Sequence, residues 1–183
     1  MLVPGVETAR LALDRPEPDD AGELFEIGSD PRVWGHFPSG RHTDIAQTKA
    51  LIARWQRSWD EARLGPWVIR LRDSSRVIGY GGCTLLDGGV WNLGYRLAAD
   101  EHGHGYATEV AREAVDRATR MHPDAPVVAS LLEHNRASAR VASKLGFALV
   151  YRGPDAGNPD AAAIRLVYAN RALTEDELRV VLH

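Results

Sequence analysis

A glycine-rich turn is the segment of this sequence best suited to bind an anion. Gly103 and Gly105 lie one residue apart, between a predicted strand at Val90–Leu97 and a helical pattern that starts at Tyr106. Glycine lets a ligand approach the backbone closely, and the first N–H groups of a helix face such a ligand with the positive end of the helix dipole behind them. The segment therefore predicts a cradle for a phosphate or pyrophosphate.

Two common phosphate motifs do not fit this turn. A P-loop needs Lys and then Ser or Thr after the second glycine, where this chain has Tyr106 and Ala107. A dinucleotide fingerprint needs Gly or Ala at the position of Thr108. Two alternatives stay open at this point: a nucleotide-binding protein that uses the same loop, and an ordinary surface turn before a helix.

A second polar segment, His134–Phe147, follows another predicted strand, Pro126–Leu132. Asn135 is a favourable helix N-cap and Gly146 a favourable helix stop. Basic side chains recur every fourth residue of this helix and form one stripe, made of Arg136, Arg140 and Lys144. Such a stripe can meet phosphate groups, although a solvated basic face is the ordinary alternative.

These motifs resemble those of one family. The pattern Gln/Arg-x-x-Gly-x-Gly/Ala fits His102–Ala107 and resembles the acetyl-coenzyme A loop of the GNAT N-acetyltransferases, with His102 where the family has Gln or Arg. Asn135–Phe147 resembles the second cofactor segment of the RimJ/RimL-type branch of this family. Two earlier segments, Glu7–Leu13 and Ser29–Val33, resemble the N-terminal motifs of the same branch. The resemblance covers most of the chain from Thr8 to Arg152, in the expected order.

The pattern of strands and helices around these motifs predicts an α/β fold. The resemblance implies a GNAT-like mixed, mostly antiparallel, splayed sheet flanked by helices, with the cofactor between the strands Val90–Leu97 and Pro126–Leu132. We expect one acetyltransferase domain over residues 1–183, a length that suits a single core. Further predicted elements are a strand at Thr8–Leu13, a helix after Asp20, a helix capped by Thr43 that runs to about Arg63, antiparallel strands at Trp67–Arg72 and Val77–Leu86, strands near Ala148–Tyr151 and Ala163–Ala169, and a last helix with a Thr174–Glu177 capping box.

The resemblance also implies the roles of individual residues toward acetyl-coenzyme A as cosubstrate. Asn135 would hydrogen-bond the pantetheine arm, and Ser138 would protonate or hydrogen-bond the leaving sulfur. His102 would open the pyrophosphate loop, and Lys144 could meet the nucleotide phosphates. The remaining implied contacts are the strand residues Tyr95, Arg96 and Leu97 along the arm, and the backbone of Gly103, His104, Gly105, Tyr106, Ala107 and Thr108 around the pyrophosphate.

Two departures from the family concern the chemistry. Related enzymes often have a Glu general base where this chain has Asn92, and many use a Tyr acid where it has Ala142. Asn does not accept a proton at neutral pH. Three alternatives stay open: Asn92 positions a water, His36 or His134 is the base, or the acceptor amine loses its proton unaided.

The composition limits the partners. The net charge of −3 gives no reason to expect nucleic acid or an anionic membrane as partner. The single cysteine, Cys83, excludes an internal disulfide and is expected to be inert core, and residues 1–5 do not resemble a signal peptide. We expect a cytoplasmic N-acetyltransferase without a metal, acting on a protein N-terminus or a small amine, with a homodimer as one form of assembly. A non-catalytic acyl-coenzyme A-binding or regulatory module is the rival hypothesis.

Overall fold

The computed structural model describes residues 5–183 and places eight strands in one sheet, in the order β1-β2-β3-β4-β5-β6-β8-β7. Residues 1–4, which include most of the segment interpreted as lacking a signal peptide, lie outside the described residues. Neighbouring strands are antiparallel except β5 and β6, which are parallel. The predicted mostly antiparallel α/β fold is therefore confirmed. The strands are β1 (Val6–Glu7), β2 (Leu11–Asp14), β3 (Trp67–Leu71), β4 (Val77–Leu86), β5 (Val90–Leu97), β6 (Val127–Leu132), β7 (Ala148–Pro154) and β8 (Ile164–Ala169).

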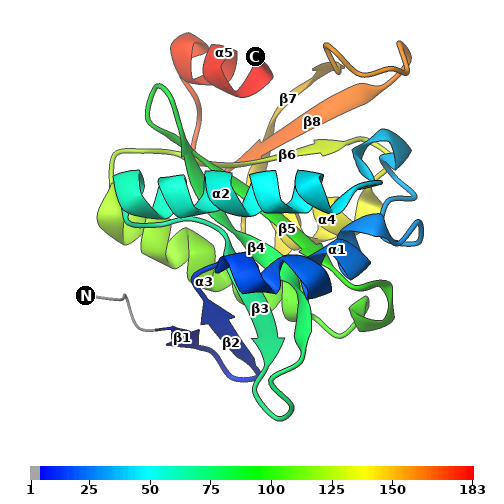
Figure 1. Cartoon of the computed structure of the whole chain (residues 1–183). Helices are drawn as coiled ribbons and strands as arrows, with labels where there is room; N and C mark the ends of the chain where they lie inside the picture. Colours follow the sequence, from blue (N-terminus) through cyan, green and yellow to red (C-terminus); the bar gives the residue numbers. More distant parts are fainter. Residues whose placement is uncertain (1–4) are drawn as a thin grey trace.

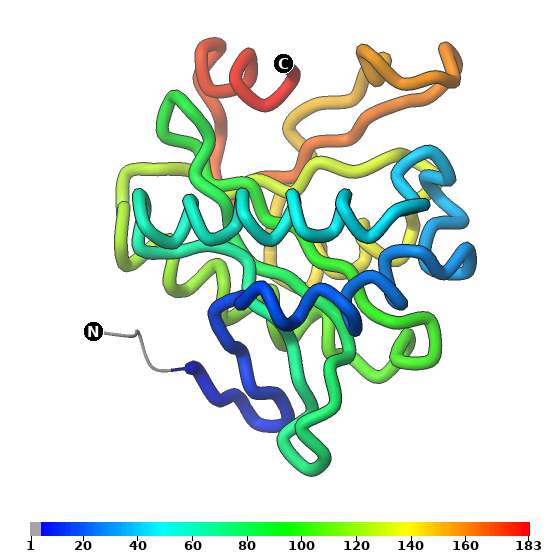
Figure 2. Tube along the Cα trace, viewed as in Figure 1, coloured from blue at the N-terminus to red at the C-terminus, as the bar shows by residue number. Residues whose placement is uncertain are grey.

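Helices cover both faces of the sheet. In Figures 1 and 2, α2 crosses one face above α1, with α5 near the C-terminus, while α3 and α4 lie behind the sheet. The strand β3 shows the division, since Val68 packs with α1 and α2 whereas Ile69 packs with the α3 side. The helices are α1 (Ala21–Ser29), α2 (Ile45–Ala62), α3 (Tyr106–Met121), α4 (Arg136–Lys144) and α5 (Glu175–Leu182).

Local signals predicted most of these elements, with two errors at their ends. The cap of α2 is Asp44 and not Thr43: the Asp44 carboxylate accepts from the Ala46 N–H at 2.7 Å, and Gln47 completes the capping box. The first long strand begins at Leu11 rather than Thr8. The local pattern could not show that the Thr8 side chain is used in a tertiary contact.

That tertiary contact joins the start of β2 to the glycine-rich turn. The Glu109 carboxylate, on the first turn of α3, accepts from the Thr8 hydroxyl at 2.6 Å and from the Arg10 N–H at 2.8 Å. The Arg10 guanidinium donates to the same carboxylate at 2.8 Å and to the His104 carbonyl oxygen at 2.8 Å. It also lies over the Tyr106 ring, 4.5 Å from its centroid. One carboxylate and one guanidinium thus fix both sides of the turn.

Ionisation of Glu109 should contribute to stability. Burial raises its pKa, but hydrogen bonds from Thr8 and Arg10 outweigh burial and leave the pKa below its usual value. Glu109→Gln should lower the free energy of unfolding by about 1–3 kcal/mol, because hydrogen bonds to a charged group are lost. For a chain of this size each kcal/mol corresponds to a fall in melting temperature of about 2–4 °C.

The control is Glu113→Gln on the same helix, which removes a surface i,i+4 pair with Arg117 and should cost only about 0.3–0.5 kcal/mol. A depressed carboxyl pKa stabilises the fold above the unfolded pKa and loses this effect as the pH falls through the folded value. The difference in free energy of unfolding between the wild type and Glu109→Gln should therefore shrink below about pH 4. Equal melting temperatures for the two variants at neutral pH would show that the contact is dispensable.

Candidate active site

The candidate site begins where β5 and β6 part. The two strands pair only at Trp91 with Val127 and at Asn92 with Val128, whereas β5 stays paired with β4 along its length. The Trp91 N–H donates toward β6 at 2.9 Å, and strand alternation directs the backbone groups of Tyr95 to the same side. The N–H and C=O of Tyr95 therefore face the opening, where β6 offers no partner.

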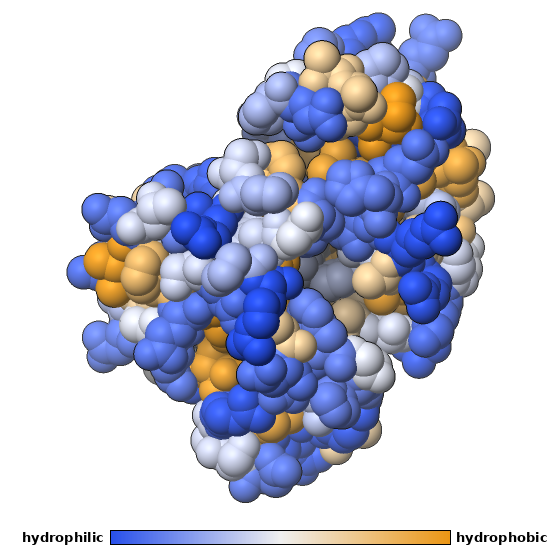
Figure 3. All heavy atoms as spheres, turned by 90° about the vertical axis from the view of Figure 1, so that its right-hand side faces the viewer, coloured by the Kyte–Doolittle hydropathy of each residue, from blue (hydrophilic) through white to orange (hydrophobic). Residues whose placement is uncertain are grey.

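A cleft of about 970 Å³ occupies this opening and continues from the glycine-rich turn to the segment between α1 and α2. Figure 3 views the molecule from the right-hand side of Figure 1 and shows a mostly hydrophilic face with a hollow near its middle. Of the predicted site residues, His104 is absent from the lining. Those that line the cleft are Asn92, Tyr95, Arg96, Leu97, His102, Gly103, Gly105, Tyr106, Ala107, Thr108, Asn135, Ser138 and Lys144.

The glycine-rich turn has the geometry of an anion cradle. Gly103 and Gly105 have φ values of 84° and 83°, a region that favours glycine. A Cβ at Gly103 would meet nothing within 4 Å, so the space above the turn is open. The N–H groups of Tyr106, Ala107 and Thr108 open α3 and have no intrahelical partner. Free donors and open space together fit a bound pyrophosphate.

The two histidines of the turn brace it rather than reach into the cradle. The His102 Nε2 lies 3.1 Å from the Leu97 carbonyl oxygen, so as an N–H it donates to the end of β5. The His104 ring stacks on Tyr106, with centroids 5.6 Å apart and planes at 22°. His102 thus ties the turn to β5 in place of the side chain expected at that position.

The start of α4 brings two polar groups to the opposite wall. The Asn135 Oδ1 caps the helix by accepting from the Ser138 N–H at 3.1 Å. This cap uses only the oxygen, so the side-chain N–H groups of Asn135 can still donate to a ligand. Burial raises the pKa of Tyr95, and the nearby Ser138 side chain acts in the opposite direction. The hydroxyl groups of Tyr95 and Ser138 are therefore neighbours on the α3–α4 side of the cleft.

The cleft lining contains two carboxylates, and each is already engaged. Of the lining residues that the structure describes, the acidic ones are Glu101 and Asp155. Glu101 is ion-paired with Arg76, and Asp155 with Arg165. Neither carboxylate is therefore free to act as the general base that Asn92 cannot be.

His36 lies in the segment between α1 and α2 and is held from two directions. Its Nε2 is 3.0 Å from the Arg96 Nη1, and its carbonyl oxygen is 2.8 Å from the His134 Nε2. Burial, followed by the charges of Arg96, His134 and His102, lowers the pKa of His36 to about 4. His36 is therefore neutral at pH 7, and its Nε2 lone pair accepts from Arg96.

Sequence reasoning missed several lining residues. Tyr80 and Thr84 on β4 and Ser130 on β6 gave no signal, because strand partners decide which side chains reach the cleft. Trp55 of α2 also lines the cleft, and its ring is tilted by 46° against that of Tyr80 with the centroids 4.6 Å apart. Cys83 is buried and its pKa is raised by burial, as expected for inert core.

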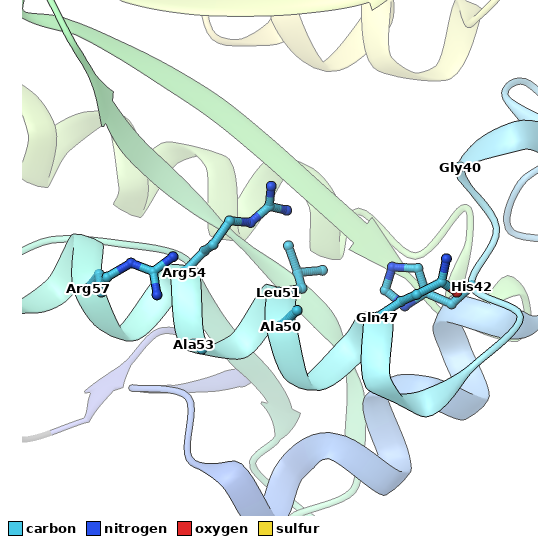
Figure 4. A pocket seen from close by; sticks show the side chains of 8 residues that line it. All are labelled: Gly40, His42, Gln47, Ala50, Leu51, Ala53, Arg54 and Arg57. Atoms are coloured by element: carbon cyan, nitrogen blue, oxygen red, sulfur yellow. The ribbon is translucent and has the colours of Figure 1, made fainter.

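A second, shallower hollow lies on the outer side of α2. Figure 4 shows Arg54 and Arg57 extending from the helix and His42 near its start. The His42 Nδ1 is 2.8 Å from the Thr48 hydroxyl.

In residues 5–183 no cluster of His, Cys, Asp and Glu is arranged to hold a metal ion. None of the described helices is long and apolar enough to cross a membrane.

Comparisons with known proteins agree with this geometry. A family model described as an acetyltransferase (GNAT) domain matches residues 10–148. The uncharacterized N-acetyltransferase p20 of Bacillus licheniformis is 29% identical over 111 residues, which are 60% of this chain and 62% of that protein. The match therefore spans less than two thirds of that relative's length.

Solved structures share the fold at low identity. A putative GNAT-family acetyltransferase from Bordetella pertussis superposes with a TM-score of 0.77 at 20% identity, over 92% of this chain and 100% of that one. RimL, a ribosomal-protein alpha-N-acetyltransferase solved with coenzyme A, gives 0.78 at 16% identity, over 92% and 98%. Since the family model extends from β2 to the first residue of β7 and so includes the parted strands and the glycine-rich turn, the chain belongs to the GNAT family of acetyltransferases, whose cosubstrate is acetyl-coenzyme A.

Proposed function

We propose that this protein transfers the acetyl group of acetyl-coenzyme A directly to a primary amine, either a protein N-terminal α-amine or the amine of a small molecule. The observation that carries the proposal is the parting of β5 from β6, which places the start of α3 and the start of α4 on one cleft. Acetyl-coenzyme A supplies an activated thioester carbonyl. The chain has to hold that group, polarise it and assist the departure of the thiolate.

Binding would use both ends of the cleft. The free N–H groups at the start of α3 suit the pyrophosphate. The unpaired backbone groups of Tyr95 and the side-chain N–H groups of Asn135 suit the amides of the pantetheine arm. Arg140 and Lys144 line the cleft and offer positive charge to the nucleotide phosphates, whereas Arg136, the third member of the basic stripe, lies outside the lining.

The departing sulfur would meet the hydroxyl of Ser138. Ser138 lies in the first turn of α4, where its backbone N–H donates to the Asn135 cap, and its side chain is near that of Tyr95. The Tyr95 phenol can supply a hydrogen bond from β5 that replaces the tyrosine lacking at Ala142. A proton held by this hydroxyl pair is placed for transfer to the thiolate.

On the amine side we propose that no side chain of the chain accepts the proton. His36 is a weak base because its pKa is about 4 and its lone pair is used by Arg96. Glu101 and Asp155 are ion-paired. Asn92 can orient a water or the amine itself, so the amine has to enter in its neutral form.

A non-catalytic acyl-coenzyme A-binding module is the second candidate, and the absence of a carboxylate at Asn92 is the observation that favours it. The decisive experiment is a panel of amines and peptides scored by release of coenzyme A. Release with any acceptor excludes the module. Binding of acetyl-coenzyme A without release from any member of a broad panel excludes our proposal.

Acetyl-coenzyme A should stabilise the fold, whereas ATP and NAD should not. At about a hundred times its dissociation constant a ligand adds roughly 2.7 kcal/mol, which corresponds to about 5–10 °C in melting temperature. Gly105→Val should abolish this shift, because its Cβ would lie 3.5 Å from the Arg10 Nη2, and a branched side chain at this positive φ would disturb the turn that forms the cradle. The matched control is Gly89→Val in the β4–β5 turn, where φ is also positive at 78° and nothing lies within 4 Å. The control should share the strain of about 1–2 kcal/mol and keep the ligand-induced shift. A Gly105→Val protein that still responds to acetyl-coenzyme A would place the pyrophosphate elsewhere.

Ser138→Ala should lower kcat far more than it weakens binding of acetyl-coenzyme A, because an interaction made with the departing sulfur appears in kcat. We expect a loss of about 10- to 100-fold, typical for one positioned proton donor. The measurement is kcat from initial rates beside the dissociation constant from a thermal-shift titration. Ser143→Ala, on the same helix, is the control. An unchanged kcat in Ser138→Ala would show that Ser138 takes no part in the departure of the sulfur.

The pH dependence should follow the acceptor and not the enzyme. Without a protein base, kcat/KM rises about tenfold per pH unit up to the pKa of the amine, which is near 8 for an α-amine and near 10.4 for a lysine-like amine. The pH profiles of kcat/KM for two acceptors of different pKa should therefore break at two different pH values, each near the pKa of its acceptor. Asn92→Glu should raise the rate near pH 7 if the new carboxylate reaches the amine or its water. A single break shared by both acceptors, and lost in His36→Gln or His134→Gln, would instead identify that histidine as the base.

A further inference from the structure

Arg96 lines the cleft and has no ion-pair partner among the described residues; unlike Arg140 and Lys144 of α4, which share this property, it lies on the strand β5. It lies on β5 opposite Tyr80 of β4. Strand alternation turns its side chain to the face of Asn92 and Gly94, away from Leu97, which packs with the α3 side. The guanidinium therefore belongs to the side of the cleft formed by α1, α2 and the segment between them.

The contacts of Arg96 orient the guanidinium without neutralising it. Its Cζ lies 3.7 Å from the centroid of the Trp34 ring, and its Nη1 donates to the neutral His36 at 3.0 Å. Its Nε is buried and has no hydrogen-bond partner among the described residues. A guanidinium has five N–H donors in a planar fork that matches a carboxylate or phosphate.

No carboxylate of the described chain is ion-paired with Arg96. The acidic residues that line the cleft are bound to other arginines, Glu101 to Arg76 and Asp155 to Arg165. The groups around His36, which are His102, His134 and Arg96 itself, bring no negative charge. A partly buried cation that lacks an anion in the protein is suited to an anion from a ligand.

The position of Arg96 relates that anion to the acceptor. Gly94 lies on the same face two residues earlier, about 6–7 Å along the strand, and is exposed at the point where the strands have parted. Tyr80 and Trp55 form an aromatic wall beside Arg96 in the same cleft. A molecule of modest size can therefore place its amine near the parted strands and an anionic group at Arg96.

We propose that Arg96 determines acceptor specificity by binding an anionic group, a carboxylate or a phosphate, that the acceptor carries beside its primary amine. This inference rests on the acetyl transfer proposed above and narrows its substrate class. Trp34 and His36 hold the guanidinium in place, and the side-chain N–H groups that they do not use receive the anion. The acceptor class is amino acids and related small amines, or N-termini followed by an acidic residue.

The test compares acceptors that differ only in the anion. The carboxylate arm uses β-alanine against propylamine and a Ser-Asp peptide against the Ser-Asn peptide. The phosphate arm uses O-phosphoethanolamine against ethanolamine. The wild-type protein should favour the anionic member of at least one arm by about 10- to 100-fold in kcat/KM, the effect of hydrogen bonds to a charged group. The arm that shows the preference identifies the source of the anion.

Arg96→Gln should remove this preference, mainly by raising KM for the anionic acceptor, and should lower kcat/KM far more for the anionic member of a pair than for the neutral one. Arg96→Lys should restore part of the preference, because it keeps the charge but not the fork. Arg57→Gln is the control, since it removes one exposed cation from the outer side of α2 and should leave the preference intact.

Three results would overturn the inference: equal use of both members of every pair, a preference that survives Arg96→Gln, or an equal loss for anionic and neutral acceptors with weaker binding of coenzyme A. The last would assign Arg96 to the cofactor. If Arg96→Gln does not fold, Arg96→Lys and the wild-type preferences decide. Absence of transfer to every amine, with acetyl-coenzyme A bound, would instead refute the proposed function itself.

Discussion

The parting of β5 from β6 is the constraint from which the rest of the site follows. A strand that loses its partner exposes N–H and C=O groups, and such groups need a hydrogen-bonding partner when they are buried. Here the sheet is complete on the β4 side and open on the β6 side after Asn92. A ligand with amide groups of its own can take the place of the missing strand. The α3 and α4 helices begin beside this opening, so capping groups and helix dipoles act on the same ligand.

Strand alternation divides the cleft into two chemical sides. Tyr95 turns its phenol toward α4 and Ser138, whereas Asn92 and Arg96 turn toward α1 and α2. Proton donors for a leaving group therefore lie on one side, and the groups that could select an acceptor lie on the other. His36 connects the second side to the first, because it contacts Arg96 on β5 and, through its carbonyl oxygen, His134 just before α4.

The sequence predicted the parts that depend on near neighbours. Gly103 and Gly105, the Asn135 cap and the Thr174 capping box were readable because residues a few positions apart create them. The cap of α2 was assigned one residue too early, since Thr43 and Asp44 both suit that role. The resemblance predicted the splayed sheet, which the strand order confirms. The environments of Arg96 and His36 were not predictable, because they depend on contacts between residues 60 positions apart.

The contacts of Glu109 with Thr8 and Arg10 link residues that are 99 to 101 positions apart in the chain. Contacts of such separation form late, because a long loop must close before they can stabilise anything. The glycine-rich turn can close locally as soon as α3 forms, but its bracing by Arg10 has to wait until β2 has joined the sheet. The braced form of the turn is thus a property of the finished fold. A truncation or local unfolding at the start of β2 would therefore remove the bracing of a turn that lies about a hundred residues away in the chain.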